Sequence, residues 1–281
     1  MASNKYNVPP NFFPASVLMW SRPVVDFLEA VARRGFGGAE VWAQHLDRTG
    51  ESVKSVRRVT RELGLRLSAH AVSYDLNPLS HNREVRLVSR RQVLESLATA
   101  AGLEANVVVV HPGHLSSSTD DPEDYWPDLF DLCGQLDERA RLFGVRVGIE
   151  GMERKVNQFF VEPEALNRLA DELAREHLDS VGLTVDLAHL ATFTSPVAPL
   201  GTIKRAFHVH LSDGDPPSAT HRPMGMGRLP LSEMVRAALE LRTPAIAIEG
   251  RWRANEELAL ERSARFLSEL GESGRGGCKA R

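Results

Sequence analysis

Four short apolar segments in the second half of the chain each end on a residue that can bind a divalent metal ion. The segments 147–150, 183–186, 207–210 and 246–249 end in Glu150, Asp186, His210 and Glu249. Three carboxylates brought together would repel one another unless a cation lay between them. Carboxylate oxygens with an imidazole nitrogen suit Mn, Co, Mg or Zn. The pattern therefore predicts a divalent metal site, and with it an enzyme.

The four residues can meet only if the elements that carry them are neighbours. Short apolar segments alternate with longer helix-periodic ones, and we interpret the former as strands at 16–20, 38–43, 66–71, 107–111, 146–152, 181–189, 206–212 and 245–250. Helices are expected at 24–34, 53–63, 83–102, 122–143, 163–176, 196–204, 229–241 and 255–270. This alternation predicts an α/β fold, a single (β/α)8 TIM barrel domain over residues 1–270. Residues 271–281 are rich in glycine and are expected to be a disordered tail.

The strand segment 107–110 consists of four valines, which is typical of a parallel sheet that helices cover on its outer face. An open dinucleotide-binding sheet would need a glycine-rich turn after its first strand, whereas the chain has Ser21-Arg22-Pro23. In a parallel barrel, catalytic side chains gather where the strands end. Strands five to eight are neighbours there, so the four residues are expected to converge.

Charge, cysteine content and the absence of long apolar segments indicate the class of protein to expect. The 281 residues carry a formal net charge of −3, which gives no basic footprint for nucleic acid. We find no signal peptide and no segment that could span a membrane, and only two cysteines. A cytoplasmic enzyme with a small-molecule substrate is expected, with a homodimer or homotetramer as a plausible assembly.

Further histidines follow the predicted strands. His70 and His111 end strands three and four, and they could hold a second cation bridged by Glu150 or instead bind substrate. His189 lies three residues after Asp186 and could contact a substrate hydroxyl or a further cation. His208 shares a face with His210 one layer deeper, where a buried neutral histidine is expected.

Aromatic and basic residues near the same strand ends are candidates for substrate binding. Trp20, Trp42 and Trp252 could form a partly apolar wall or could pack the barrel. Arg222 lies in a glycine-rich loop after strand seven, where it could pair with a phosphate; a tight turn is the alternative interpretation of this loop.

These motifs resemble the sugar isomerase/epimerase superfamily with a xylose-isomerase-like barrel, to which endonuclease IV also belongs. The resemblance is carried by Glu150, Asp186-Leu187-Ala188-His189, His210-Leu211-Ser212-Asp213, Gly225-Met226-Gly227 and Glu249. It implies that the four strand-end residues bind the metal, that Glu150 and Glu249 are catalytic and move a proton, and that His189 binds substrate. At the place of His221 the ketose epimerases have an arginine.

The endonuclease branch is similar in its histidines. The resemblance implies matches at His70, His111, His189 and His221, and so at eight of that branch's metal ligands. Its ninth ligand is an aspartate where this chain has Ala219, and its first strand is of a His-Val-Ser type where this chain has Val17-Leu18-Met19-Trp20.

The expected activity is metal-dependent isomerisation or epimerisation of a small keto-sugar, polyol-derived ketone or sugar phosphate. Glu150 and Glu249 would transfer the proton next to a carbonyl through an enediolate that the metal stabilises. The alternatives are an endonuclease IV-like multi-zinc phosphodiesterase acting on abasic DNA, and a dehydratase of the same superfamily.

Overall fold

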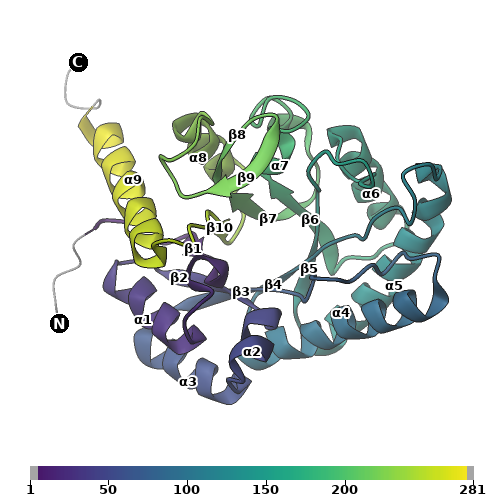
Figure 1. Ribbon diagram of the computed structural model, residues 1–281, viewed down its shortest axis with the longest axis horizontal. Coiled ribbons are helices and arrows are strands. Elements are labelled where there is room, and N and C mark those ends of the chain that lie inside the picture. Colours follow the sequence, from purple (N-terminus) through teal and green to yellow (C-terminus); the bar gives the residue numbers. More distant parts are fainter. Residues whose placement is uncertain (1–5, 277–281) are drawn as a thin grey trace.

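Eight parallel strands form one sheet in the computed structural model, which describes residues 6–276 (Figure 1). They are β1 (Phe12–Pro14), β2 (Gly38–Trp42), β3 (Arg66–His70), β4 (Val107–Val110), β5 (Arg146–Glu150), β6 (Val181–Asp186), β7 (Ala206–Leu211) and β10 (Ile246–Ile248). Their order is β1-β10-β7-β6-β5-β4-β3-β2, and every pairing is parallel. An isolated parallel bridge between Ala15 and Glu40 joins the two edge strands. The expected TIM barrel is therefore confirmed.

Helices surround the sheet (Figure 1). The longer ones are α1 (Val24–Arg33), α3 (Val53–Leu63), α4 (Arg83–Leu103), α5 (Trp126–Phe143), α6 (Pro163–Arg175), α8 (Leu231–Glu240) and α9 (Glu256–Gly276). Local signals fix their ends: Ser52 and Asn82 cap α3 and α4 through side-chain oxygens, and Gly64 ends α3 in the left-handed conformation. Within residues 6–276 no helix has the length and apolarity to cross a bilayer.

The first predicted strand was wrong. Residues 12–14 form β1 instead, and the expected segment contains a 3-10 turn, η1 (Ser16–Met19). The turn is closed by a hydrogen bond from the Leu18 amide to the Ala15 carbonyl, and all four of its residues are buried. A short buried apolar segment does not reveal its backbone conformation by periodicity, so the pattern could not separate a strand from a turn.

Three later segments also differ from expectation. Strand β6 ends at Asp186, because the Asp186 side chain accepts a hydrogen bond from the His189 amide and starts a short helix, α7 (Leu187–Leu190). The expected helix 196–204 is reduced to the turn η3 (Leu200–Thr202). The loop after β7 contains a hairpin, β8 (Asp213–Asp215) with β9 (Ser218–Arg222). Two further elements, α2 (Ala43–Thr49) and the 3-10 turn η2 (Pro122–Tyr125), were not predicted separately.

Helix α9 continues through Gly276, so residues 271–276 differ from the disordered tail expected from residue 271. Once a helix exists, each added residue gains a hydrogen bond, and a terminal glycine costs only about 1 kcal/mol. Residues 277–281 of that expected tail lie outside the described residues.

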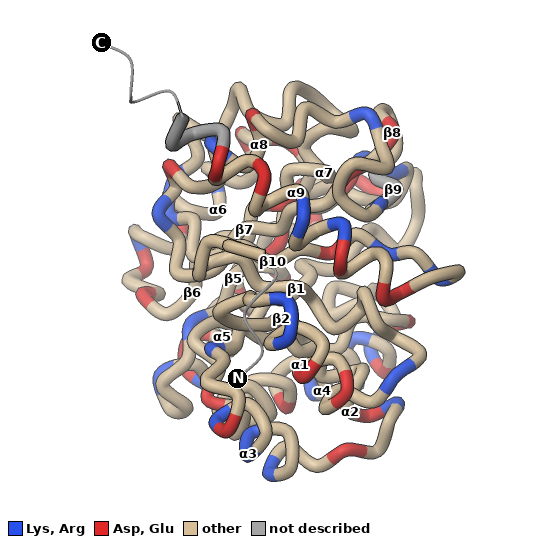
Figure 2. Tube along the Cα trace, turned by 90° about the vertical axis from the view of Figure 1, so that its left-hand side faces the viewer, with Lys and Arg blue, Asp and Glu red and all other residues tan. Residues whose placement is uncertain are grey.

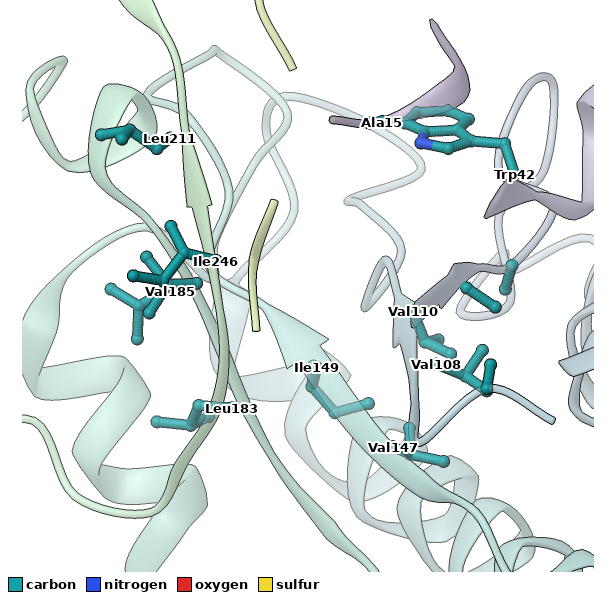
Figure 3. Packing of buried hydrophobic residues seen from close by; sticks show 14 of the residues in the cluster. Ala15, Trp42, Val108, Val110, Val147, Ile149, Leu183, Val185, Leu211 and Ile246 are labelled. Atoms are coloured by element: carbon teal, nitrogen blue, oxygen red, sulfur yellow. The ribbon is translucent and has the colours of Figure 1, made fainter. Parts of the chain in front are cut away.

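The apolar core lies between the sheet and the helices. Outward-facing strand residues such as Val108, Val110, Ile149 and Leu183 belong to it (Figure 3). The alternate positions face the barrel axis and are largely polar. Basic and acidic residues are interspersed along the outer trace in Figure 2. The barrel therefore has a polar interior inside an apolar shell. The predicted metal ligands lie in this polar interior.

Candidate metal centre

The four predicted metal ligands converge at the carboxyl ends of β5, β6, β7 and β10. Ligand atoms of Glu150, Asp186, His210 and Glu249 all lie within 4.8 Å of one another, and all four residues are buried. The His210 Nδ1 atom is 3.1 Å from Glu150 Oε1, 3.3 Å from Glu249 Oε2 and 4.0 Å from Asp186 Oδ2. The structure therefore brings the four candidate ligands together.

The strand register explains the convergence. Asp186 pairs with His210, and Ala247 pairs with the same histidine from the other side. Glu249 follows directly after β10, where its amide donates to the Leu211 carbonyl at 3.1 Å. Because neighbouring parallel strands end at one rim, these side chains project toward one point near the barrel axis.

The donor set fits a divalent cation. Asp186 Oδ2 and Glu249 Oε1 are buried and have no hydrogen-bond partner among the described residues, and Glu150 Oε2 is buried with His111 Nε2 at 3.0 Å. Burying carboxylate oxygens without compensation is costly, and a cation bound to oxygen and nitrogen donors would remove that cost.

Electrostatics within the cluster point the same way. Burial alone would lower the pKa of His210, but Glu249, Glu40 and Glu150 raise it well above its ordinary value. Burial would likewise raise the pKa of Glu150, yet His210 and His111 hold it well below its usual range. Both pKa directions therefore favour positive charge among these carboxylates, which a bound metal ion would supply.

A buried carboxylate that the sequence analysis missed lies beneath His210. Glu40 of β2 accepts hydrogen bonds from His208 Nε2 at 2.8 Å and Ser68 Oγ at 3.0 Å, and its Oε1 is 3.4 Å from His210 Nε2. Burial would raise the pKa of Glu40, but His210 and His208 hold it far below its usual value. A ligating histidine is commonly supported in this way through its second nitrogen. The sequence offered one indication of this role, since Glu40 is the only charged residue in the otherwise apolar strand Gly38–Trp42.

Besides the group of Glu40, His208 and His210, two more clusters of possible metal ligands adjoin the four residues. One consists of His70, His111 and Glu150: His111 Nε2 lies 3.0 Å from Glu150 Oε2, and His70 Nε2 lies 3.6 Å from the same oxygen. Glu150 therefore belongs to this cluster as well as to the group of four. The second joins Glu153 with His189 and His221, whose Nε2 atoms are 3.1 Å apart. The four predicted histidines are therefore all brought to the centre, whereas Glu153 was not predicted.

The orientation of His189 is fixed by the backbone. His189 Nδ1 lies 2.8 Å from the Gly151 carbonyl, which can only accept, so this nitrogen carries the proton. In the neutral ring, His189 Nε2 then presents a lone pair toward Glu153 and His221. This cluster can therefore accept either a cation or a donor group of a substrate.

A cavity of about 220 Å³, the central cavity, opens above the four residues. Trp42 lines it, as does Arg251, whose buried Nε has no hydrogen-bond partner among the described residues and which the sequence analysis missed. The predicted substrate contacts Trp20, Arg222 and Trp252 are not among its lining residues. Trp20 packs behind Trp42 at 6.4 Å between ring centroids, and Arg222 is paired with Asp215 at 2.6 Å because the unpredicted hairpin turns it that way.

A larger cavity of about 780 Å³, the side cavity, shares His111, Met152 and Glu153 with the central cavity. It extends from the centre over the loops that follow β3, β4 and β5. The two cavities together therefore offer room for more than one small molecule near the four candidate ligands.

Comparisons with known proteins agree with this architecture. A family model described as xylose isomerase-like TIM barrel matches residues 28–270. An uncharacterized protein of Methanocaldococcus jannaschii, MJ1311, is 22% identical over 244 residues, which cover 85% of this chain and 82% of that protein. The crystal structure of a D-tagatose 3-epimerase-like protein superposes with a TM-score of 0.78 at 23% identity, covering 95% of this chain and 99% of that chain. The TTHB071 protein from Thermus thermophilus, soaked with ZnCl2, superposes with a TM-score of 0.72 at 28% identity over 94% and 98% of the two chains.

Proposed function

The chain belongs to the xylose isomerase-like TIM barrel family, and from that premise we propose that it is a metal-dependent sugar isomerase or epimerase. The observation that carries the proposal is the buried group of Glu150, Asp186, His210 and Glu249, whose ligand atoms lie within 4.8 Å of one another beside the central cavity that Glu150 and Glu249 line. A divalent cation held there would supply Lewis acidity to a substrate carbonyl and its neighbouring hydroxyl.

Proton transfer falls to the two glutamates. Glu249 and Glu150 both line the central cavity; Glu249 Oε1 is buried without a hydrogen-bond partner among the described residues, and Glu150 Oε2 lies 3.0 Å from His111 Nε2. Either can take the proton from the carbon next to the carbonyl, and the other can return a proton to the opposite face or to the next carbon. His189 and His221 line the same cavity and can bind substrate hydroxyl groups.

A metal-dependent phosphodiesterase is the second candidate function. Two further clusters favour it, one of His70, His111 and Glu150 and one of Glu153, His189 and His221. Several cations held there could activate water and stabilise the transition state of phosphodiester hydrolysis. A dehydratase would share the first proton abstraction and differ only in losing water from the adjacent carbon, so product analysis separates it from an isomerase.

The proposal is tested by deuterium incorporation into ketoses in D2O with Mn²⁺-loaded protein. We expect exchange in the wild type and a loss of at least 100-fold in E249Q with the fold preserved, because one positioned acid–base group contributes about 10²–10⁴-fold. E123Q is the control, since Glu123 is exposed and pairs with Arg168 on the outer surface. Unchanged exchange in E249Q would contradict the assignment of this glutamate.

Abasic-site DNA and metal analysis separate the two candidate functions. One cation per chain with exchange on sugars supports the isomerase. Incision of an abasic duplex, without exchange on any ketose and with two or three cations per chain, would replace it with the phosphodiesterase.

A further inference from the structure

We infer that the substrate is a keto-sugar bearing a second, uncharged sugar ring, so that the protein acts on a glycoside or disaccharide, with the second ring in the side cavity. This inference rests on the proposed function, because it places the reacting ketose over the metal ligands. It goes beyond that function by naming the size and charge of the substrate.

The two cavities are neighbours that share part of their lining. The central cavity, at about 220 Å³, is smaller than the roughly 300–1,000 Å³ typical of ligand pockets, and suits a single small molecule. The side cavity of about 780 Å³ lies next to it and shares His111, Met152 and Glu153 as lining residues. A substrate confined to one ring over the candidate metal ligands would leave the larger neighbouring cavity empty.

The side cavity is lined mainly by neutral hydrogen-bonding groups. Its polar residues include three serines, two asparagines and a glutamine: Ser73, Ser80, Ser116, Asn77, Asn82 and Gln158. Ser73 Oγ and Gln158 Oε1 are buried without any hydrogen-bond partner among the described residues. Buried polar atoms of this kind are rare in proteins unless water or a ligand satisfies them. Hydroxyl and amide groups pair well with the hydroxyls of a sugar.

The charges of the side cavity disfavour an anionic occupant. Among the described residues that line it, the only lysine, Lys155, is paired with Glu153, and there is no arginine. The remaining charged carboxylate there is Asp75, which would repel a phosphate. Phosphate recognition generally relies on unpaired basic groups, so a sugar phosphate or a nucleic acid backbone fits this cavity less well than a neutral ring.

The loops that follow β3 and β4 are held together by direct contacts, so this wall of the side cavity is formed before any ligand binds. Gly113 has φ +101°, and a Cβ there would lie 2.8 Å from Asn77 Oδ1 and 2.9 Å from Leu79 Cγ. Asn77 Oδ1 accepts from the His114 amide at 3.1 Å, and Asn77 Nδ2 donates to the His114 carbonyl at 2.8 Å. A preformed wall reduces the ordering cost of binding, which favours a specific subsite over a solvent-filled gap.

The test compares sugars by isothermal titration on Mn²⁺-loaded protein. The probes are D-fructose, D-fructose 6-phosphate, and the disaccharides lactulose and isomaltulose, which each join an aldose ring to fructose. We expect at least one disaccharide to bind with a Kd at least tenfold lower than D-fructose. We expect S73A and Q158L to reduce that ratio several-fold, because each removes a hydrogen-bonding group from the lining of the side cavity.

A blocking variant covers the case in which those changes disturb the fold. V85W places a large ring at an exposed position of α4 that lines the side cavity and should reduce the disaccharide preference toward one. L87W is its matched control, since Leu87 is exposed on the same helix but lines a different cavity.

Equal affinity for D-fructose and both disaccharides would overturn the inference and leave the proposed function standing. Tighter binding of D-fructose 6-phosphate than of either disaccharide would also overturn it. The same holds if S73A, Q158L and V85W weaken D-fructose and the disaccharides alike. Absence of binding and of deuterium exchange for every sugar would reject the proposed function itself.

Discussion

Replacing Glu40 by glutamine should weaken metal binding from a position that never touches the metal. The carboxylate lies one layer below the centre, where it bonds His208 and Ser68 and faces His210 Nε2 at 3.4 Å. Glutamine keeps nearly the same shape and volume but loses the negative charge. The imidazole of His210 would then lose the anion that orients it and strengthens it as a ligand.

The magnitude follows from the geometry. A separation of 3.4 Å is longer than an ordinary hydrogen bond, so the support is mainly electrostatic. At an effective dielectric constant of about 20, the gross attraction between unit charges at such a distance is about 4–5 kcal/mol. Desolvation offsets much of this in a buried pair. We therefore expect a net loss of about 1.4–2.7 kcal/mol, or about 10–100-fold in metal affinity.

The assay is competition with a fluorescent chelator at pH 7.5 for wild type, E40Q and D137N. Asp137 is a matched control, because it is also a buried carboxylate but lies on α5, where it accepts from the Ser180 amide at 2.8 Å. D137N should lower stability without changing metal affinity. If E40Q binds Mn²⁺ as tightly as the wild type, or if D137N weakens binding equally, the reasoning about Glu40 is wrong.

Three further predictions concern the same centre and its support. Mn²⁺ binding should release about one proton at pH 7, because the carboxylates raise the pKa of His210 and the metal displaces its proton. The affinity for Mn²⁺ should therefore fall by up to tenfold per pH unit below that pKa. Calorimetry in two buffers measures the protons released, and a value of zero would contradict this prediction. G148A should lower the free energy of unfolding by about 1–3 kcal/mol, since a Cβ there would overlap Thr184 Oγ1, and urea titration should show that G148A/T184A recovers most of the loss; no recovery would reject this packing account. Chelation should lower the thermal midpoint, because a cation at 100 times its Kd adds about 2.7 kcal/mol, and a midpoint indifferent to chelator in circular dichroism would argue against a bound ion.

Much of the fold was predictable because its signals are local. The helix predicted over 53–63 coincides with α3, where Ser52 and Gly64 mark the two ends. Three apolar segments end in Glu150, Asp186 and His210, so one pattern predicted both the strands and the side chains that cluster at their ends. A parallel barrel then supplies the convergence without further information, since all strand ends share one rim.

The features that were missed depend on partners distant in the sequence. Glu40 is recognisable as a support only through His208, which is 168 residues away. Glu153 and Arg251 lie in loops whose paths are set by packing rather than by periodicity. The hairpin after β7 turned Arg222 toward Asp215, and the short loop signals gave no indication of that pairing.

The closure of the cylinder and the charge balance of its interior depend on one residue. The backbone of Glu40 forms the isolated bridge with Ala15 that joins the first and second strands, while its side chain supports His210. Any fluctuation that separates those strands also withdraws the anion from the imidazole. Binding of a cation and pairing of the first strand with the second are therefore thermodynamically linked, so each should favour the other.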